Sequence, residues 1–282
     1  MSKLFTVIIP CYKNSIFLTS CIDSVLKQSY PQIEIIVCED CGGGFDVDYY
    51  QDYIANHKKT NIKQFCVYSN PENYGTVKNI NCALKQSHGY FVKIIASDDA
   101  LMTPDALVKV ALEFEKTDAE CLLSDVLLCD EQLHSVSKAK SAFLKNINKM
   151  SATECFKRLC VRNRINAVGV FFKKSFFDAN GLFDEKYKLL EDWPTWLRIY
   201  DRGDRIYYYP FIATKRRMAV GVVSNNNPDF LADRRRVFFD IIKPNKEKIG
   251  MVIYIKSLIG AYVFTNQSFR KVYYRLKKGD AQ

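Results

Sequence analysis

Two adjacent carboxylates, Asp98 and Asp99, directly follow an apolar, β-branched run at residues 90–97. Such a run is typical of a buried strand, and open α/β sheets bind their ligands at the carboxyl ends of their strands. Neighbouring anions raise each other's pKa unless a cation neutralises them, and hard divalent metals combine few carboxylates with substrate phosphates. The pair therefore indicates a metal–diphosphate site. The alternative is a solvated turn and helix cap ahead of Pro104.

Polar and aromatic residues follow three other strand-like runs. These residues form the motifs Pro10-Cys11-Tyr12-Lys13-Asn14, Glu39-Asp40, and Asn73-Tyr74-Gly75 with Lys78-Asn79. If the strands are parallel, all four ends meet at one edge of the sheet. That edge would carry an aromatic ring, carboxylates and a lysine, which are the groups needed to hold a base, a ribose, a metal and a diphosphate.

The elements that must position these groups alternate along the first half of the chain. Strand patterns fall at residues 4–9, 33–38, 62–68 and 90–96, and helical patterns at 18–26 and 76–86. This βαβ rhythm predicts an α/β fold with one Rossmann-like, mostly parallel central sheet flanked by helices.

The second half continues with mixed strand and helix patterns. We expect helices from Pro104 to about 116, after a capping box at 151–154, up to Gly181 and over 193–200, and strands at 120–129 and 168–172. Residues 138–149 are predicted to form a loop, and two short strands are expected on either side of Pro210.

Composition limits the possible classes. Hydrophobic residues make up 48% of the 282 residues, which is enough for a large core. No secretion signal is recognisable, so we expect the ten cysteines to be reduced. Cys38 and Cys41 have the spacing of half a zinc site, but no second pair exists and the histidines are scattered, so structural zinc is not expected.

The net charge of +10 is concentrated at the end of the chain, where residues 231–282 hold twelve Lys/Arg against four Asp/Glu. Such a tail favours an anionic surface, either nucleic acid or acidic lipid, or it is a solvated helix face. The apolar run 249–264 is too short and too interrupted to span a bilayer. With Tyr254 and Tyr262 it predicts an interfacial helix or, alternatively, a packed amphipathic helix pair.

Taken together, these motifs resemble the family-2 inverting glycosyltransferases of the GT-A fold over roughly residues 4–224. The resemblance also rests on Gly181-Leu182-Phe183-Asp184-Glu185 and on Leu190-Glu191-Asp192-Trp193-Pro194-Thr195-Trp196-Leu197-Arg198. It implies a GT-A domain at 1–224, with a nucleotide-sugar-binding half at 1–100 and an acceptor-binding half at 101–224. A basic helical C-terminal extension would follow at 225–282.

The resemblance also implies residue roles in donor binding. Asp40 would hydrogen-bond the uracil ring, Tyr12 would pack near the base, and Lys78 would approach the base or the phosphates. Asp99 would contact the metal, Mn²⁺ or Mg²⁺, and Asp98 the metal or the ribose. Since Ala96 replaces an acid often found in the family, the donor's diphosphate would supply more of the metal ligands.

The remaining implied roles concern catalysis and the diphosphate. Asp192 would be the catalytic base, with Glu191 beside it. Arg217 and Ser224 match a pattern in the loop that covers the diphosphate, and Pro10 joins the donor-binding set.

The implied function is inverting transfer of a hexose or N-acetylhexosamine from a UDP-sugar to a hydroxyl of an acceptor glycan. We expect a lipid-linked acceptor in bacterial cell-surface polysaccharide synthesis, such as O-antigen or capsule. The expected location is cytoplasmic and peripheral at the inner face of the membrane, in contact with anionic lipid and without a nucleic-acid partner. The alternatives are a nucleotidylyltransferase and a non-catalytic glycan- or nucleic-acid-binding protein.

Overall fold

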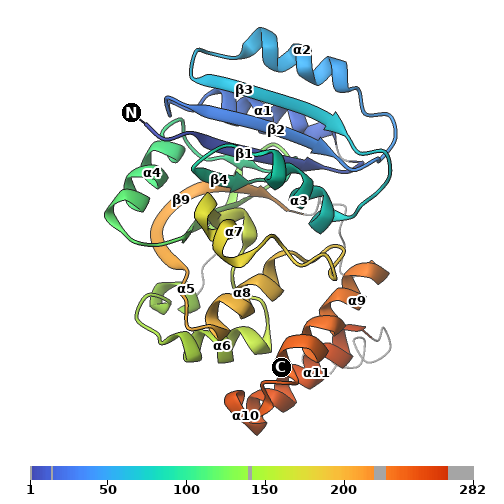
Figure 1. Ribbon diagram of the computed structural model, residues 1–282, viewed down its shortest axis with the longest axis vertical. Helices are drawn as coiled ribbons and strands as arrows, with labels where there is room; N and C mark the ends of the chain where they lie inside the picture. Colours follow the sequence, from blue (N-terminus) through green and yellow to red (C-terminus); the bar gives the residue numbers. More distant parts are fainter. Residues whose placement is uncertain (1, 14, 139–141, 219–226, 266–282) are drawn as a thin grey trace. The chain divides into compact units, whose positions relative to one another are not determined.

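The computed structural model describes residues 2–13, 15–138, 142–218 and 227–265 (Figure 1). Asn14, Ser224 and the expected boundary at 224/225 lie outside these residues. The described residues form two compact units. The first lies within Met1–Asn148, Asn166–Phe183 and Arg205–Val222, and the second within Lys149–Ile165, Asp184–Asp204 and Val223–Gln282.

The first unit is built on one sheet. Among the described residues, its strand order is β3-β2-β1-β4-β8-β6-β9-β5, with β7 paired to β6. Figure 1 shows the β3-β2-β1-β4 part of this order. Its strands are β1 (Phe5–Cys11), β2 (Ile33–Glu39), β3 (Ile62–Ser69), β4 (Phe91–Ile94), β5 (Ala100–Leu101), β6 (Cys121–Cys129), β7 (Ser135–Lys138), β8 (Val170–Lys173) and β9 (Tyr207–Arg217).

The four strands that precede the candidate site residues are parallel. β1 pairs with β2 and β4, and β2 pairs with β3, all in parallel register. β8 runs antiparallel between β4 and β6, and β9 is parallel to β6. The expected α/β fold with one central sheet is therefore confirmed, and the pairing is parallel from β3 to β4 and mixed in the rest of the sheet.

Helices cover both faces of this sheet. α1 (Leu18–Leu26), α2 (Val47–His57) and α4 (Ala106–Lys116) contribute to one apolar cluster on one face. α3 (Thr76–Gln86) packs against β1 and β2 outside that cluster. The unit also contains α5 (Ala142–Asn146), α7 (Lys174–Asn180), η1 (Ser15–Phe17) and η2 (Ala167–Gly169).

Two local expectations are wrong, and the sequence patterns missed one helix. The missed helix is α2, in which only Tyr50 and Ile54 of eleven residues are buried and the apolar pattern is weak. The predicted loop at 138–149 contains the end of β7 and the whole of α5. The two strands around Pro210 are one strand, because a register shift accommodates the proline, which cannot donate a ladder hydrogen bond.

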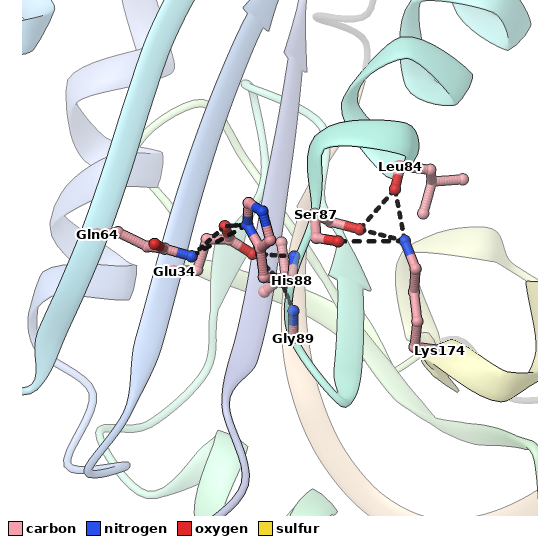
Figure 2. A network of polar contacts seen from close by, with 8 residues as sticks. Glu34, Gln64, Leu84, Ser87, His88, Gly89 and Lys174 are labelled. Atoms are coloured by element: carbon pink, nitrogen blue, oxygen red, sulfur yellow. Dashed lines mark hydrogen bonds and ion pairs between the residues drawn. The ribbon is translucent and has the colours of Figure 1, made fainter.

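A buried carboxylate fastens the loop between α3 and β4 to strands β1, β2 and β3. Glu34 of β2 accepts hydrogen bonds from the Thr6 hydroxyl and from the backbone amide of His88 at 2.8 Å. Its other oxygen contacts Gln64 Nε2 at 2.5 Å and His88 Nδ1 at 2.8 Å (Figure 2). Lys174 holds the same loop from α7, through the Ser87 hydroxyl and the Leu84 carbonyl. Both carboxylate oxygens of Glu34 therefore have partners, and this cluster serves as a structural anchor.

The second unit is helical. It contains α6 (Ala152–Val161), α8 (Asp192–Asp201), α9 (Pro228–Val237), the π-helical η3 (Phe238–Ile242), α10 (Lys246–Ile249) and α11 (Met251–Thr265). The capping box of Ser151 and Glu154 starts α6, as predicted, and Asn227 caps α9. Of these helices, α9, η3, α10 and α11 follow β9 along the chain. Within the described residues, none of the helices has both the length and the apolar character needed to cross a membrane.

Candidate active site

The carboxyl ends of the parallel strands form one edge of the sheet in the first unit. The Asp40 amide donates to the Cys11 carbonyl at 2.9 Å, and the Asn70 amide donates to the Glu39 carbonyl at 2.8 Å. The Ser97 amide donates to the Pro10 carbonyl at 3.3 Å. These bonds place the residues that follow β2, β3 and β4 side by side around the end of β1.

Asp40 is buried and organises the loop that precedes α3. Its Oδ1 accepts hydrogen bonds from Asn70 Nδ2 at 3.0 Å and from the Tyr74 amide at 2.9 Å. Its Oδ2 accepts from the Gly75 amide at 2.8 Å. Gly75 has φ of 80°, a value that glycine adopts readily. These three bonds occupy most of the acceptor capacity of the Asp40 carboxylate. Two of them come from the backbone just before α3, so Asp40 fixes the conformation of the chain where α3 begins.

The aromatic and basic residues at this edge are partly exposed. The Lys78 ammonium lies 3.6 Å from the centre of the Tyr74 ring, and Lys13 lies 5.1 Å from that of Tyr12. Pro10, Tyr12 and Lys78 therefore stand on the segments next to Asp40, although no contact between Asp40 and either Tyr12 or Lys78 is seen.

The Asp98–Asp99 pair lies in the turn after β4. Asp99 is only 3% exposed, and its Oδ1 accepts a hydrogen bond from the Arg217 amide at 3.0 Å. Burial, and then the neighbouring Asp98 carboxylate, raise the pKa of Asp99 to about 7. Burial also raises the pKa of Asp98, although Arg216 and Arg217 oppose the shift. The pair is thus a desolvated anionic site whose charge is incompletely compensated.

Arg217 holds this acidic turn through its whole side chain. Nη1 donates to the Asp98 carbonyl at 2.6 Å, and Nε donates to the Glu131 carbonyl at 2.7 Å. Nη2 donates to the Ser20 hydroxyl at 3.0 Å, and the guanidinium lies 4.4 Å from the centre of the Phe17 ring. In this arrangement Arg217 holds the turn that carries the two carboxylates. The charge of the more exposed Arg216 lowers the pKa of both Asp98 and Asp99.

A second buried cation lies deeper in the sheet. Lys93 of β4 donates to the carbonyls of Val168 and, at 3.1 Å, Val170. Burial lowers the pKa of Lys93 to about 7, and the Asp99 charge opposes this shift.

The residues present fit a divalent cation only in part. Two hard carboxylates with raised pKa values are donors that such a cation would stabilise. Across the described ranges, however, no group of three or more His, Cys, Asp or Glu side chains could hold a metal ion. A cation at Asp98 and Asp99 therefore needs further oxygen ligands, and a diphosphate is a natural source of them.

Asp192 begins α8 in the second unit. Its Oδ1 accepts a hydrogen bond from the Trp193 amide at 2.5 Å, and its Oδ2 accepts one from Asn163 Nδ2 at 2.6 Å. Burial, and then the Asp192 charge, raise the pKa of Glu191 to about 8. Hydrogen bonds to a carboxylate favour its ionised form, so Asp192 rather than Glu191 is the better candidate for an anionic base.

The family model described as "Glycosyl transferase family 2" matches residues 6–177, which is more than half of the chain. The chain belongs to glycosyl transferase family 2. An uncharacterized glycosyltransferase of Rickettsia prowazekii is 24% identical over 254 residues, covering 89% of this chain and 76% of the relative.

Solved structures of this fold extend the similarity. Staphylococcus aureus TarS 1–349 in complex with UDP-GlcNAc is 19% identical, with a TM-score of 0.61, and the match covers 94% of this chain and 82% of that 1–349 chain. The mannosyltransferase PcManGT from Pyrobaculum calidifontis, in complex with GDP-Man and Mn²⁺, is 15% identical, with a TM-score of 0.61, and covers 100% of this chain and 80% of PcManGT. The family-2 chain therefore has the expected GT-A fold.

Sequence reasoning about this family-2 glycosyltransferase missed Asn163, which belongs to no motif and contacts Asp192 across 29 positions along the chain. Asn70 lies in the polar segment between β3 and α3 that the sequence singles out, but its hydrogen bonds, which join Asp40 to Asn79, were not predicted.

Proposed function

We propose that this chain is an inverting glycosyltransferase that uses a UDP-sugar donor. The proposed reaction moves a hexose or N-acetylhexosamine to a hydroxyl of an acceptor glycan. The observation that carries this proposal is the Asp98–Asp99 pair, in which Asp99 is buried and Arg217 holds the turn at the carboxyl edge of the sheet, because its incompletely compensated charge calls for a cation and a diphosphate. Family membership and a structural neighbour solved with UDP-GlcNAc support the donor class.

The proposed donor site uses the first unit. Asp40 and Tyr12 take the nucleoside, Lys78 the base or phosphates, and Pro10 the adjoining backbone surface. Asp99 and Asp98 hold Mn²⁺ or Mg²⁺ together with the diphosphate, and a Mn²⁺-bound neighbour supports this choice of metal. Such a metal stabilises the negative charge of the leaving nucleoside diphosphate. Arg217 contributes by fixing the turn that carries both acids.

The proposed chemistry is a single displacement. The acceptor hydroxyl gives its proton to the Asp192 carboxylate while its oxygen bonds to the anomeric carbon. The bond from that carbon to the diphosphate breaks, UDP leaves with its electron pair, and the anomeric configuration inverts. A positioned base of this kind typically contributes ~10²–10⁴-fold.

We further propose a lipid-linked acceptor glycan in cell-surface polysaccharide synthesis, such as O-antigen or capsule. The corresponding location is cytoplasmic, at the inner face of the membrane and in contact with anionic lipid. The basic residues and apolar helix of the C-terminal region support this assignment, and a nucleic-acid partner is not part of it.

A panel of nucleotide sugars with Mn²⁺ or Mg²⁺, read as donor hydrolysis and transfer, tests the proposal. We expect hydrolysis of a UDP-sugar and none without a divalent metal. Asp192→Asn should retain donor binding and lose turnover, whereas a nucleotidylyltransferase would release diphosphate from a nucleoside triphosphate instead. Unchanged turnover in Asp192→Asn would remove Asp192 from the role of base.

A further inference from the structure

Helix α11 presents an apolar surface to solvent. Its inner side packs against α6, α9, α10 and η3, with Ser257 buried and the Tyr254 ring 5.6 Å from that of Phe238. The opposite side carries five large apolar residues that are 46–67% exposed, namely Met251, Val252, Ile255, Ile259 and Tyr262. These five residues, which we call the α11 outer face, recur at helical spacing and therefore form one continuous stripe.

This stripe is unusual for a helix at a protein surface. A surface helix ordinarily buries one apolar side and exposes a polar one, whereas a helix that is apolar all round is buried on every side. Contiguous exposed apolar patches mark binding surfaces. The α11 outer face therefore indicates that a further apolar phase or molecule covers it.

Cations border the α11 outer face. Lys256 is exposed on α11 itself, one turn from Val252. Arg235 of α9 lies 5.9 Å from the centre of the Tyr262 ring and 5.6 Å from that of the exposed Phe239, and Lys243 lies 5.5 Å from the same Phe239 ring. An apolar stripe with aromatic rings and cations at its border is typical of helices that lie in the interface of an anionic membrane.

The same charges disfavour pairing with a second copy. A two-fold interface brings the same patch of both copies together, so the bordering Arg235, Lys243 and Lys256 would meet like charges. Over residues 227–265 the sequence holds seven Lys/Arg against four Asp/Glu, so the excess charge is positive. Anionic headgroups complement this excess, and acyl chains complement the stripe.

We propose that the α11 outer face is the surface by which this protein binds an anionic lipid bilayer, with α11 lying in the plane of the interface. The proposal rests on the membrane-linked acceptor of the proposed function, and it adds the contacting residues. Met251, Val252, Ile255, Ile259 and Tyr262 enter the acyl boundary, while Arg235, Lys243 and Lys256 contact lipid phosphates.

The test is co-sedimentation of the full chain with vesicles of phosphatidylcholine, with and without phosphatidylglycerol. We expect binding to the anionic vesicles that weakens with salt, and much weaker binding to phosphatidylcholine alone. Ile255→Glu with Ile259→Glu should lower the partition coefficient by at least ~tenfold. The matched control, Leu112→Glu with Val136→Glu, changes two residues of the first unit that are 50% and 61% exposed, and it should leave binding unchanged.

Three results would overturn the proposal. The wild-type chain could fail to bind anionic vesicles, or the Ile255/Ile259 double variant could bind as well as the wild type does. The double variant could instead abolish a concentration-dependent dimer, which would identify a second copy as the occupant.

Donor hydrolysis in vesicle-free solution separates this proposal from the proposed function. The double variant should hydrolyse donor as the wild type does, because none of its changes touches the proposed donor site. Absence of hydrolysis with every nucleotide sugar would contradict the proposed function and leave the vesicle result standing.

Discussion

Glu34, in strand β2, and Asp99, in the turn after β4, are two buried carboxylates of the first unit, and they differ in how fully they are hydrogen-bonded. Glu34 accepts four hydrogen bonds, and although burial raises its pKa, the bonds from Thr6 and His88 outweigh this and leave the pKa below its ordinary value of 4.5. Asp99 accepts a hydrogen bond from the Arg217 amide beside a second acid, and its pKa is raised to about 7. The satisfied acid stabilises the fold, whereas the other retains a charge that a ligand can complement.

The largest effect is expected from Asp99→Asn. Its turnover should fall at least ~10²-fold, because the charge stabilisation supplied by a metal is worth several kcal/mol. Its stability should stay the same or rise, because the substitution removes a buried charge and keeps the acceptor for the Arg217 amide. Steady-state transfer and denaturant unfolding measure the two effects. A variant with normal turnover and a lower unfolding midpoint would reverse the roles of the two acids.

Glu34→Gln should show the opposite behaviour. We expect its free energy of unfolding to fall by ~1.5–3 kcal/mol, the scale of hydrogen bonds to a charged group, because an amide nitrogen would face hydrogen-bond donors. Turnover per folded molecule should not change. Urea unfolding followed by circular dichroism checks the stability, and wild-type stability in this variant would contradict the anchoring role.

Asp192 is intermediate between Glu34 and Asp99 in how fully it is hydrogen-bonded, because each of its two oxygens accepts a bond from one described donor. Asn163→Ala should lower kcat about tenfold, the equivalent of ~1.4 kcal/mol, because the predicted base loses the bond that orients it. KM for the donor should not change, since Asn163 lies in the second unit and the proposed donor residues in the first. A higher donor KM with normal kcat would contradict this positioning role.

The smallest effect is a pH dependence of stability. The pKa of Glu34 is lower in the folded chain than its ordinary 4.5, so its contribution to stability is complete above that value. The contribution is lost as the pH falls through the folded pKa. The difference in unfolding free energy between wild type and Glu34→Gln should therefore shrink as the pH drops below 4.5. Urea titrations from pH 7 to pH 3 measure it, and a constant difference would exclude ionised Glu34 as the cause.

The sequence was informative where a single pattern determines the local structure. Apolar runs placed β1 to β4, and the parallel order then brought Asp40 and Asp98–Asp99 to one edge of the sheet. Sequence-based prediction failed where the role of a residue depends on partners that are distant along the chain. The Arg217 guanidinium reaches the Asp98 carbonyl across 119 positions and the Glu131 carbonyl across 86, and no local pattern encodes either contact. The weakly apolar α2 shows the same limit, because it docks through the buried Tyr50 and Ile54 together with the partly buried Val47 and Tyr53.

The central claim is that Asp98 and Asp99 form a cation site that a nucleoside diphosphate completes. Calorimetric titration of the full chain with Mn²⁺, in the presence and absence of UDP, tests it most directly at one fixed pH. We predict weak or undetectable binding of Mn²⁺ alone, clear binding with UDP, and loss of the UDP-dependent binding in Asp99→Asn but not in Glu34→Gln. Equal Mn²⁺ binding with and without UDP, or unchanged UDP-dependent binding in Asp99→Asn, would contradict the claim.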